Sequence, residues 1–85
     1  MSIFINRLSK IDLHGYDYQS AYVATNDFIE ESYLLNQNEV VIVHGIGEGI
    51  VKKSVHDALS RNKKVKEFKI CPDNIGCTIV EIISK

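Results

Sequence analysis

Residues 40–47 read Val-Val-Ile-Val-His-Gly-Ile-Gly, a β-branched run that ends in a histidine and two glycines. Such a run is typical of a central parallel strand that is buried on both faces. Residues 11–15, Ile-Asp-Leu-His-Gly, follow the same plan, because a short apolar strand again ends in a His-Gly pair. Open α/β sheets bind ligands at the tips of such strands. The two tips together therefore predict one composite site that holds Asp12, His14 and His44.

A segment with the pattern of a helix follows each His-Gly pair. The first helix is expected from Tyr18 to about Leu35, with Asp17 as its N-cap. An apolar stripe with small members repeats along it at three- and four-residue steps: Ala21, Ala24, Thr25, Phe28, Ser32 and Leu35. The second helix is expected from Ile50 to Arg61, with Asn62 as a left-handed C-cap. Its predicted core face is Val51, Val55, Ala58 and Leu59.

Strand patterns fill the rest of the chain. Residues 10–14 alternate apolar and polar side chains, and residues 65–70 mix Lys and Glu with Val, Phe and Ile, as a strand with one solvated face does. Residues 77–83 form a strongly β-branched last strand. The order βαβαββ predicts an α/β fold of the α+β sandwich type, a mixed four-stranded sheet with two helices on one face.

Size and composition indicate one small soluble domain. The 85 residues are 45% hydrophobic and 25% charged, as in ordinary globular chains. No segment approaches the ~20 apolar residues that span a bilayer, and the N-terminus lacks the pattern of a secretion signal. We therefore expect a cytoplasmic monomer without a membrane partner. It would consist of an N-terminal arm at residues 1–8 and one domain at residues 9–85.

The two cysteines, Cys71 and Cys77, lie six residues apart around a turn marked by Pro72 and Gly76. A disulfide across that turn is geometrically feasible, but a reducing compartment argues against it. The spacing is not that of a zinc site, and no histidine accompanies the pair. We expect reduced, partly buried thiols, and no residue is assigned as a metal ligand.

The net charge of −1 conceals an uneven distribution along the chain. Residues 11–43 carry six acidic residues and no lysine or arginine, whereas residues 44–70 carry seven basic residues against three acidic ones. Phosphate is the commonest partner of a basic side, which favours nucleic-acid binding. The candidate contacts are Lys52, Lys53, Lys63, Lys64 and Lys66. An ordinary solvated helix surface explains the same lysines equally well.

Asp12 and His14 share one face of the first strand, because side chains alternate in direction along a strand. A carboxylate beside an imidazole can fix its tautomer, which suits general acid or base catalysis on a phosphodiester. The alternative is structural. In that case Asp12 accepts hydrogen bonds from the amides of the following turn, and His14 merely closes it.

The glycines that follow His44 suggest an anion site. Gly45, Gly47 and Gly49 permit a tight loop whose N–H groups lie at a helix N-terminus, where a phosphate can bind. The spacing G-x-G-x-G differs from the dinucleotide fingerprint G-x-G-x-x-G, and the chain is too short for a dinucleotide fold. A plain glycine turn with a satisfied histidine is the alternative.

Three further aromatic side chains lie in or near the predicted helices. His56 is expected to be a solvated histidine on the flank of the second helix. Tyr16 and Tyr18 flank the first strand tip and could stack on a base, although partial burial in the core explains them equally well. No nucleophilic Ser or Cys stands in an activating motif, so a covalent enzyme intermediate is not expected.

Three segments together resemble the Smr (small MutS-related) domain family. They are residues 11–15, Val-Ile-Val-His-Gly-Ile-Gly at 41–47 and Cys-Thr-Ile-Val-Glu-Ile at 77–82. The family motifs are Leu-Asp-x-His, His-Gly-x-Gly and a last strand close to Thr-x-Val-x-Leu. The match covers about residues 9 to 84, and Ile11 stands where the family usually has Leu.

The resemblance implies a fold like the C-terminal domain of bacterial initiation factor three. It also implies a nuclease-associated domain that nicks branched DNA or cleaves RNA, in some members on the ribosome. Asp12 and His14 match the first motif, and His44, Gly45 and Gly47 match the second.

We therefore predict an endonuclease domain in which His14 or His44 is the general base or acid and Asp12 orients His14. Cleavage of RNA through its 2′-hydroxyl needs no metal, and a divalent cation such as Mg²⁺ is the one cofactor considered. The alternative is a non-catalytic module that binds branched DNA or ribosomal RNA.

Overall fold

The fold is described from a computed structural model that places residues 8–47 and 49–85. Residues 1–7, which form most of the predicted N-terminal arm, lie outside the described residues, as does Glu48 in the glycine loop. Leu8, the last residue of that predicted arm, is half-buried and packs against the sheet.

Six elements confirm the predicted order βαβαββ. They are β1 (Ser9–Asp12), α2 (Tyr18–Leu34), β2 (Glu39–Val43), α3 (Ile50–Arg61), β3 (Val65–Cys71) and β4 (Asn74–Ile82). In the part of the chain that the structure describes, neither helix is long and apolar enough to cross a membrane.

The four strands form one mixed sheet in the order β1-β2-β4-β3. β1 pairs in parallel with β2, and β4 lies antiparallel to both β2 and β3. In the parallel pair Asp12 lies opposite Val43. The loops that follow both strands therefore leave the sheet side by side at one edge, which is where open sheets build their sites.

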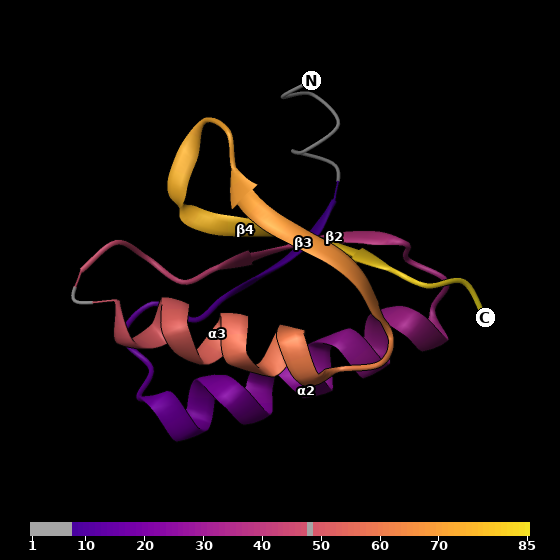
Figure 1. Ribbon diagram of the computed structural model, residues 1–85, viewed down its shortest axis with the longest axis horizontal. Helices are drawn as coiled ribbons and strands as arrows, with labels where there is room; N and C mark the ends of the chain where they lie inside the picture. The colour runs from indigo at the N-terminus through magenta and orange to yellow at the C-terminus, as the bar shows by residue number, and fades with distance from the viewer. Residues whose placement is uncertain (1–7, 48) are drawn as a thin grey trace.

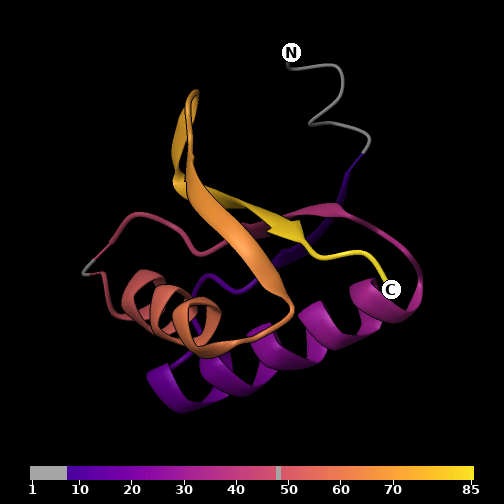
Figure 2. The same ribbon diagram turned by 45° about the vertical axis from the view of Figure 1, so that its right-hand side comes forward.

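Both helices cover one face of the sheet, as predicted (Figure 1). Figure 2 shows α2 and α3 running side by side beneath the strands. The core lies between these two layers and consists of aliphatic side chains from both: Leu13, Ala21, Ile29, Val40, Ile42, Val55, Leu59, Val80 and Ile82. Each fully buried large aliphatic side chain contributes roughly 1.5–3 kcal/mol to folding. This layer therefore fixes the strand tips relative to the helices.

The start of α2 follows the prediction, and its buried stripe follows it in part. The carboxylate of Asp17 accepts a 2.7 Å hydrogen bond from the amide of Ser20, which caps the helix. Among the predicted stripe residues, Ala21, Thr25 and Ser32 are buried. Leu35 is 61% exposed and lies just after the end of the helix, whereas Ile29, which the prediction omits, is fully buried in the core.

The end of α3 differs from the prediction. Asn62 is not a left-handed cap, since its backbone is extended (φ −92°, ψ 117°). Its side-chain oxygen accepts a 2.9 Å hydrogen bond from the amide of Lys64, and its amide group donates to Oδ1 of Asn26 on α2. These side-chain bonds end the helix and also join it to its neighbour.

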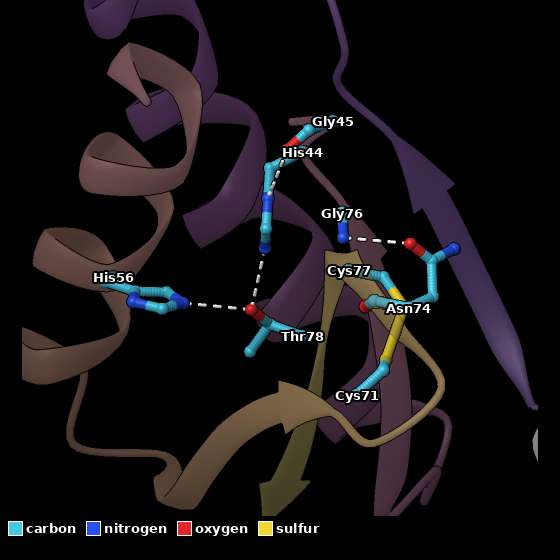
Figure 3. Close-up of a disulfide and its surroundings, with 8 residues drawn as sticks. All are labelled: His44, Gly45, His56, Cys71, Asn74, Gly76, Cys77 and Thr78. Carbon is cyan, nitrogen blue, oxygen red and sulfur yellow. Dashed lines mark hydrogen bonds between the residues drawn. A yellow bond between two sulfur atoms is a disulfide. The ribbon is translucent and has the colours of Figure 1, made fainter. Parts of the chain in front are cut away.

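The opposite face of the sheet, which neither described helix covers, carries a smaller apolar cluster: Leu8, Val41, Val43, Cys71, Cys77 and Ile79. Cys71 and Cys77 form a disulfide across the β3–β4 hairpin (Figure 3). The expectation of reduced thiols is therefore wrong for this structure. The physical reason is that the hairpin holds the two Cα atoms 5.6 Å apart, a usual separation for a disulfide.

Candidate functional site

The two His-Gly loops lie together, as the sequence predicts. The amide of Leu13 donates a 2.7 Å hydrogen bond to the carbonyl of Val43, which continues the β1–β2 pairing up to both loops. A pocket of about 270 Å³ lies between these loops and the first turn of α3, with residues 14–16, 44–47 and 49–52 as its walls. That volume suits one phosphate with its sugar better than a large ligand.

Asp12 and His14 form an exposed couple at this pocket. Nδ1 of His14 lies 2.6 Å from Oδ1 of Asp12, and the backbone amide of His14 donates to the same oxygen at 3.1 Å. A carboxylate accepts hydrogen bonds, so in the neutral imidazole the proton is on Nδ1 and the lone pair is on Nε2. The hydrogen bond from the His14 ring holds the pKa of the Asp12 carboxyl below its ordinary value.

Asp12 therefore accepts hydrogen bonds both from the amide of the turn and from the imidazole. The side chain of His14 is 73% exposed. Its Nε2 is accessible to a substrate, which makes His14 suitable as a general base.

His44 is placed differently from the prediction. It is 3% exposed, and its ring points toward Thr78 (Figure 3). Nδ1 lies 3.0 Å from the carbonyl oxygen of Gly45, and Nε2 lies 2.9 Å from Oγ1 of Thr78. Burial lowers the pKa of His44. The sequence predicts His14 or His44 as the acid/base residue, and because His44 is buried with both ring nitrogens in contact, we do not assign it that role.

Thr78 was missed by the sequence reasoning, and His56 was misplaced. Nε2 of His56 lies 2.8 Å from Oγ1 of Thr78, so two imidazoles meet at one buried hydroxyl. The His56 ring also packs against the rings of His44 and Phe68, with centroids 5.7 Å and 5.1 Å away. His56 is half-buried rather than solvated, and burial lowers its pKa.

The alternation of side chains along the strands contains the signal that could have found these contacts. Residues 40 and 42 of β2, and 80 and 82 of β4, face the helices. The same alternation places His44 and Thr78 in this inward row. A buried polar side chain requires a hydrogen-bond partner, and α3 supplies His56.

The glycine loop approaches its neighbours most closely at Gly45. Its φ is +82°, and a Cβ at this position would meet Cβ of His14 at 3.3 Å. A larger residue would therefore be strained and would displace His14. The amides of Gly45 and His44 both donate to the carbonyl of Gly76 at 2.9 Å. Because the Gly45 N–H is already bonded, it is removed from the predicted phosphate contacts.

The rest of the loop leads into α3 without a side-chain cap. Gly49 is the N-cap residue and has no side chain that could accept hydrogen bonds from the first-turn amides, and no acidic residue lies in that turn. Gly47, Gly49 and Lys52 belong to the wall of the pocket. The first-turn amides and the positive end of the helix dipole therefore border the pocket. Gly47 and Gly49 remain predicted phosphate contacts.

Among the candidate lysines, Lys52 is the one that lines the pocket. Lys53 bonds Asp57 at 3.3 Å on the surface of α3. The other three, Lys63, Lys64 and Lys66, follow the far end of α3. For a 12-residue helix that end is about 18 Å away.

In the fold, the acidic and basic parts of the sequence contact each other, which reduces the predicted charge asymmetry. Lys64 bonds Glu30 of α2 at 2.7 Å, and its ammonium lies 5.1 Å from the centroid of the Tyr33 ring. The acidic helix α2 packs beside the basic helix α3. The basic and acidic parts of the sequence are therefore neighbours in the fold.

The two tyrosines near the first loop differ in position. Tyr16 lines the pocket and is 44% exposed, so its ring is available to stack on a base. Tyr18 donates a 2.5 Å hydrogen bond to Asp57 and thereby joins α2 to α3. This hydrogen bond raises the pKa of the Tyr18 hydroxyl.

The described residues do not form a metal site. Within residues 8–47 and 49–85, no three His, Cys, Asp or Glu side chains are grouped so that they could hold a metal ion. Magnesium prefers several oxygen ligands, and the carboxylate of Asp12 is already bonded to His14. The donors that this part of the chain offers do not fit Mg²⁺, and we derive no step through a metal ion.

Sequence comparison identifies relatives over nearly the whole chain. Residues 11–82 match the Smr domain. The chain is 43% identical over 75 residues to Endonuclease MutS2 of Streptococcus suis (strain 05ZYH33), a match that covers 85% of this chain and 10% of that protein. It is 38% identical over 76 residues to Endonuclease MutS2 of Streptococcus mutans, covering 89% of this chain and 10% of that protein. The chain therefore spans about a tenth of the length of these curated relatives.

Two solved structures share the fold. The Smr domain of Thermus thermophilus MutS2 aligns with a TM-score of 0.86 at 26% identity, over 89% of this chain and 99% of that chain. YdaL, a stand-alone small MutS-related protein from Escherichia coli, gives a TM-score of 0.82 at 19% identity, over 91% of this chain and 65% of that chain. The match over residues 11–82 and the shared fold confirm the resemblance seen in the sequence: this chain belongs to the Smr domain family.

Proposed function

We propose that this Smr domain binds structured nucleic acid at the pocket between its two His-Gly loops and cleaves a phosphodiester bond there, with His14 as the acid/base residue. The observation that carries the proposal is the exposed Asp12–His14 couple. Its 2.6 Å hydrogen bond fixes Nδ1 and leaves Nε2 accessible. The loop and the helix end beside it are suited to hold a phosphate. The name of the relatives, Endonuclease MutS2, supports the same reaction class.

With RNA as substrate, the 2′-hydroxyl is the nucleophile. Nε2 of His14 removes its proton, the 2′-oxygen forms a bond to the adjacent phosphorus, and the bond from phosphorus to the 5′-oxygen breaks. The products are a 2′,3′-cyclic phosphate and a 5′-hydroxyl, whose proton comes from water. His14 then releases its proton to solvent. Asp12 orients the ring and stabilises the imidazolium that forms.

With DNA as substrate, which lacks the 2′-hydroxyl, His14 removes a proton from water instead. The resulting hydroxide forms a bond to phosphorus, the bond from phosphorus to one bridging oxygen (3′ or 5′) breaks, and that oxygen takes a proton from water. His14 then releases its proton to solvent, and the products carry a phosphate on one end and a hydroxyl on the other. The ends of the products therefore identify the nucleophile.

Binding is expected to rest on the phosphate contacts of Gly47, Gly49 and Lys52, with a base stacked on Tyr16. We further expect the domain to act as a monomer in the cytoplasm on branched DNA or on RNA, including RNA of the ribosome. The family resemblance supports the substrate classes, whereas the location and the monomeric state are expectations from the size and composition of the sequence.

A non-catalytic binding module is the second candidate function. The position of His44 favours it, because one exposed histidine remains at the pocket where the sequence predicts two. In this case the same loops recognise branched DNA or ribosomal RNA without turnover.

The test uses the purified protein with three end-labelled substrates: a four-way DNA junction, a hairpin RNA, and the same hairpin with 2′-O-methyl groups. Each is incubated with and without EDTA, and binding is measured in parallel. His14→Ala is the test variant. Gln19→Ala, at an exposed position at the start of α2, is the control.

Cyclic phosphate ends that disappear with 2′-O-methyl groups, persist in EDTA and require His14 would support the RNA mechanism. Hydrolytic ends from the junction that require His14 would support the DNA mechanism. Tight binding without cleavage of any substrate would overturn catalysis in favour of the binding module.

A further inference from the structure

A hydrogen-bonded cluster lies behind the pocket and is not used by the chemistry above. His44 at the end of β2, Thr78 in β4 and His56 in α3 meet through the Thr78 hydroxyl, and Nδ1 of His44 contacts the carbonyl of Gly45 (Figure 3). His44 is 3% exposed and Thr78 is fully buried. Side chains from three separate elements thus form one hydrogen-bonded chain, which ends at the Gly45 carbonyl in the glycine loop.

The chemistry of these groups fixes the position of each proton. A carbonyl oxygen only accepts hydrogen bonds, so Nδ1 of His44 donates to Gly45. In a neutral imidazole Nε2 then carries a lone pair and accepts from the Thr78 hydroxyl. The Thr78 oxygen in turn accepts from Nε2–H of His56. The chain of donation runs from His56 through Thr78 and His44 to Gly45.

The surroundings favour the neutral imidazoles that this arrangement requires. Burial lowers the pKa of both His44 and His56, and the charge of Lys52 acts in the same direction. The hydrogen bond to the Gly45 carbonyl opposes this lowering of the pKa at His44, and the charge of Asp57 opposes it at His56.

The end of this chain determines the direction of one loop amide. The described chain contains no cis peptide bond, and in a trans peptide the carbonyl and the following N–H point in opposite directions. Because the Gly45 carbonyl points toward the buried His44 ring, the N–H of Ile46 points away from it. Ile46 is 67% exposed and lines the pocket. The two preceding amides, of His44 and Gly45, are both bonded to Gly76.

We propose that Thr78 and His56 are positioning residues of the phosphate site: acting through His44, they orient the Gly45–Ile46 peptide and present the Ile46 amide to the bound phosphate. This inference rests on the phosphate site proposed above and adds Ile46 to it. Neither Thr78 nor His56 touches the phosphate.

The first measurement needs no variant. Long-range ¹H–¹⁵N spectra of the imidazoles at pH 8 report which ring nitrogen is protonated. The expected result is a proton on Nδ1 of His44 and on Nε2 of His56. A proton on Nε2 of His44 would overturn the chain of donation.

The second measurement follows the backbone amides of the loop during titration with inorganic phosphate. In the wild type, the Ile46 signal is expected to shift together with those of Gly47 and Gly49. Thr78→Val removes the hydroxyl at nearly constant shape. It is expected to move the Ile46 signal before phosphate is added and to weaken phosphate binding by about tenfold, the size of one lost hydrogen bond. Thr78→Ser keeps the hydroxyl and is expected to restore both.

Thr25→Val is the matched control. Its hydroxyl is also fully buried, but it has no hydrogen-bond partner among the described residues. It is therefore expected to leave the loop signals and phosphate binding unchanged. His56→Gln, which keeps a side-chain N–H donor, and His56→Phe, which keeps only the ring, form a second pair in case Thr78→Val does not fold.

Unchanged Ile46 signals and phosphate affinity in folded Thr78→Val, or equal effects of the two His56 variants, would overturn the proposal. If the wild type binds no phosphate, the phosphate site fails and the proposal fails with it. Protons observed on the expected ring nitrogens would then show that the cluster only supports the fold. If phosphate shifts Gly47 and Gly49 but not Ile46, the site stands and the role of Ile46 is wrong.

Discussion

Two histidines that follow neighbouring parallel strands have opposite environments in this domain. His14 is exposed and has one nitrogen bonded to Asp12, so the other can exchange a proton with a substrate. His44 is buried between Gly45 and Thr78, with both nitrogens engaged. We therefore propose a chemical role for the histidine at the first strand tip and a role in loop geometry for the histidine at the second.

Asp12→Asn is expected to reduce cleavage and leave folding intact. The amide keeps the shape of the side chain but not the charge that stabilises an imidazolium. The loss should be smaller than the ~10²-fold or greater loss expected without the imidazole. Single-turnover rates measure it. Asp17→Asn is the control, because asparagine caps a helix about as well as aspartate. Equal rates for Asp12→Asn and wild type would contradict the assigned role of Asp12.

Stability should decrease in mildly acidic solution because of His44 and His56. Burial lowers the pKa of both in the folded protein, so between the folded value and the unfolded value of about 6.5 the unfolded chain binds more protons. The stability that comes from burying the neutral imidazoles is therefore fully present above the unfolded pKa. It is lost as the pH falls below that value and through the folded pKa. Urea unfolding at pH 8, 7, 6 and 5 measures the effect.

The matched variant for this effect is His56→Gln, which cannot titrate. Its free energy of unfolding should change less between pH 8 and pH 5 than that of the wild type. The lowered pKa values of Asp12 and Asp57 act at lower pH, because the ordinary value of aspartate is 3.8. A wild-type stability that is constant from pH 8 to pH 5 would contradict the burial of neutral histidines.

Candidate lysines lie in the first turn of α3 and beyond its far end, and we expect the two groups to differ in their contribution to binding. Lys52→Glu reverses a charge at the pocket, whereas Lys63→Glu reverses an exposed charge beyond the other end. We expect Lys52→Glu to weaken nucleic-acid binding more and to reduce the salt slope by about one phosphate contact. Affinity measured from low to high salt tests this. Equal effects of both variants would show that binding follows net charge and not the pocket.

The β3–β4 hairpin is closed by a disulfide and also supports the glycine loop through Gly76. Reduction should therefore lower stability by about 2 kcal/mol, the value for a short closed loop. For a domain of this size the melting temperature falls by roughly 10 °C. The double variant Cys71→Ser/Cys77→Ser should melt at the lower temperature with or without a thiol reductant. A wild-type melting temperature that is insensitive to reductant would contradict the prediction.

The order and type of all six elements followed from local signals in the sequence. Asp17 marked the start of α2, and the β-branched run at residues 40–43 marked the central strand. The errors lie where contacts distant in sequence decide the outcome. Asn62 ends α3 through a bond to Asn26, and Ile29 rather than Leu35 faces the sheet. Ile29 lies four residues after Thr25 and three before Ser32, so the helical repeat of the sequence could have found it. The bond from Asn62 to Asn26 has no local signature.

The candidate site was predictable in part for the same reason. The convergence of both loops follows from parallel pairing, and the Asp12–His14 couple follows from the alternation of side chains. Thr78 contacts His44, which lies 34 residues earlier in the chain, and His56, which lies 22 residues earlier. The alternation of side chains places His44 and Thr78 in the inward row, but their contact with each other and with His56 also depends on how β2, β4 and α3 assemble around one core. The spacing of Cys71 and Cys77 permits a disulfide, but the hairpin that holds their Cα atoms 5.6 Å apart is seen only in the fold.

The described part of the domain thus presents one exposed imidazole beside a pocket, at an edge built by two parallel strands and α3. We propose that this pocket binds a phosphate. Everything proposed about its activity depends on His14. Because His14 is exposed and its bonded partner Asp12 is exposed as well, its removal should not affect the fold. Its contribution to chemistry can therefore be separated from its contribution to binding.

The decisive measurement is the single-turnover cleavage rate of His14→Ala, compared with the wild type on whichever hairpin RNA or DNA junction the wild type cleaves, with the dissociation constant measured alongside. The predicted result is a rate lower by ~10²-fold or more with affinity unchanged, the usual size of a general acid/base contribution. A rate that is unchanged, or that falls only in proportion to affinity, would contradict the assignment of His14 as the acid/base residue of this Smr domain.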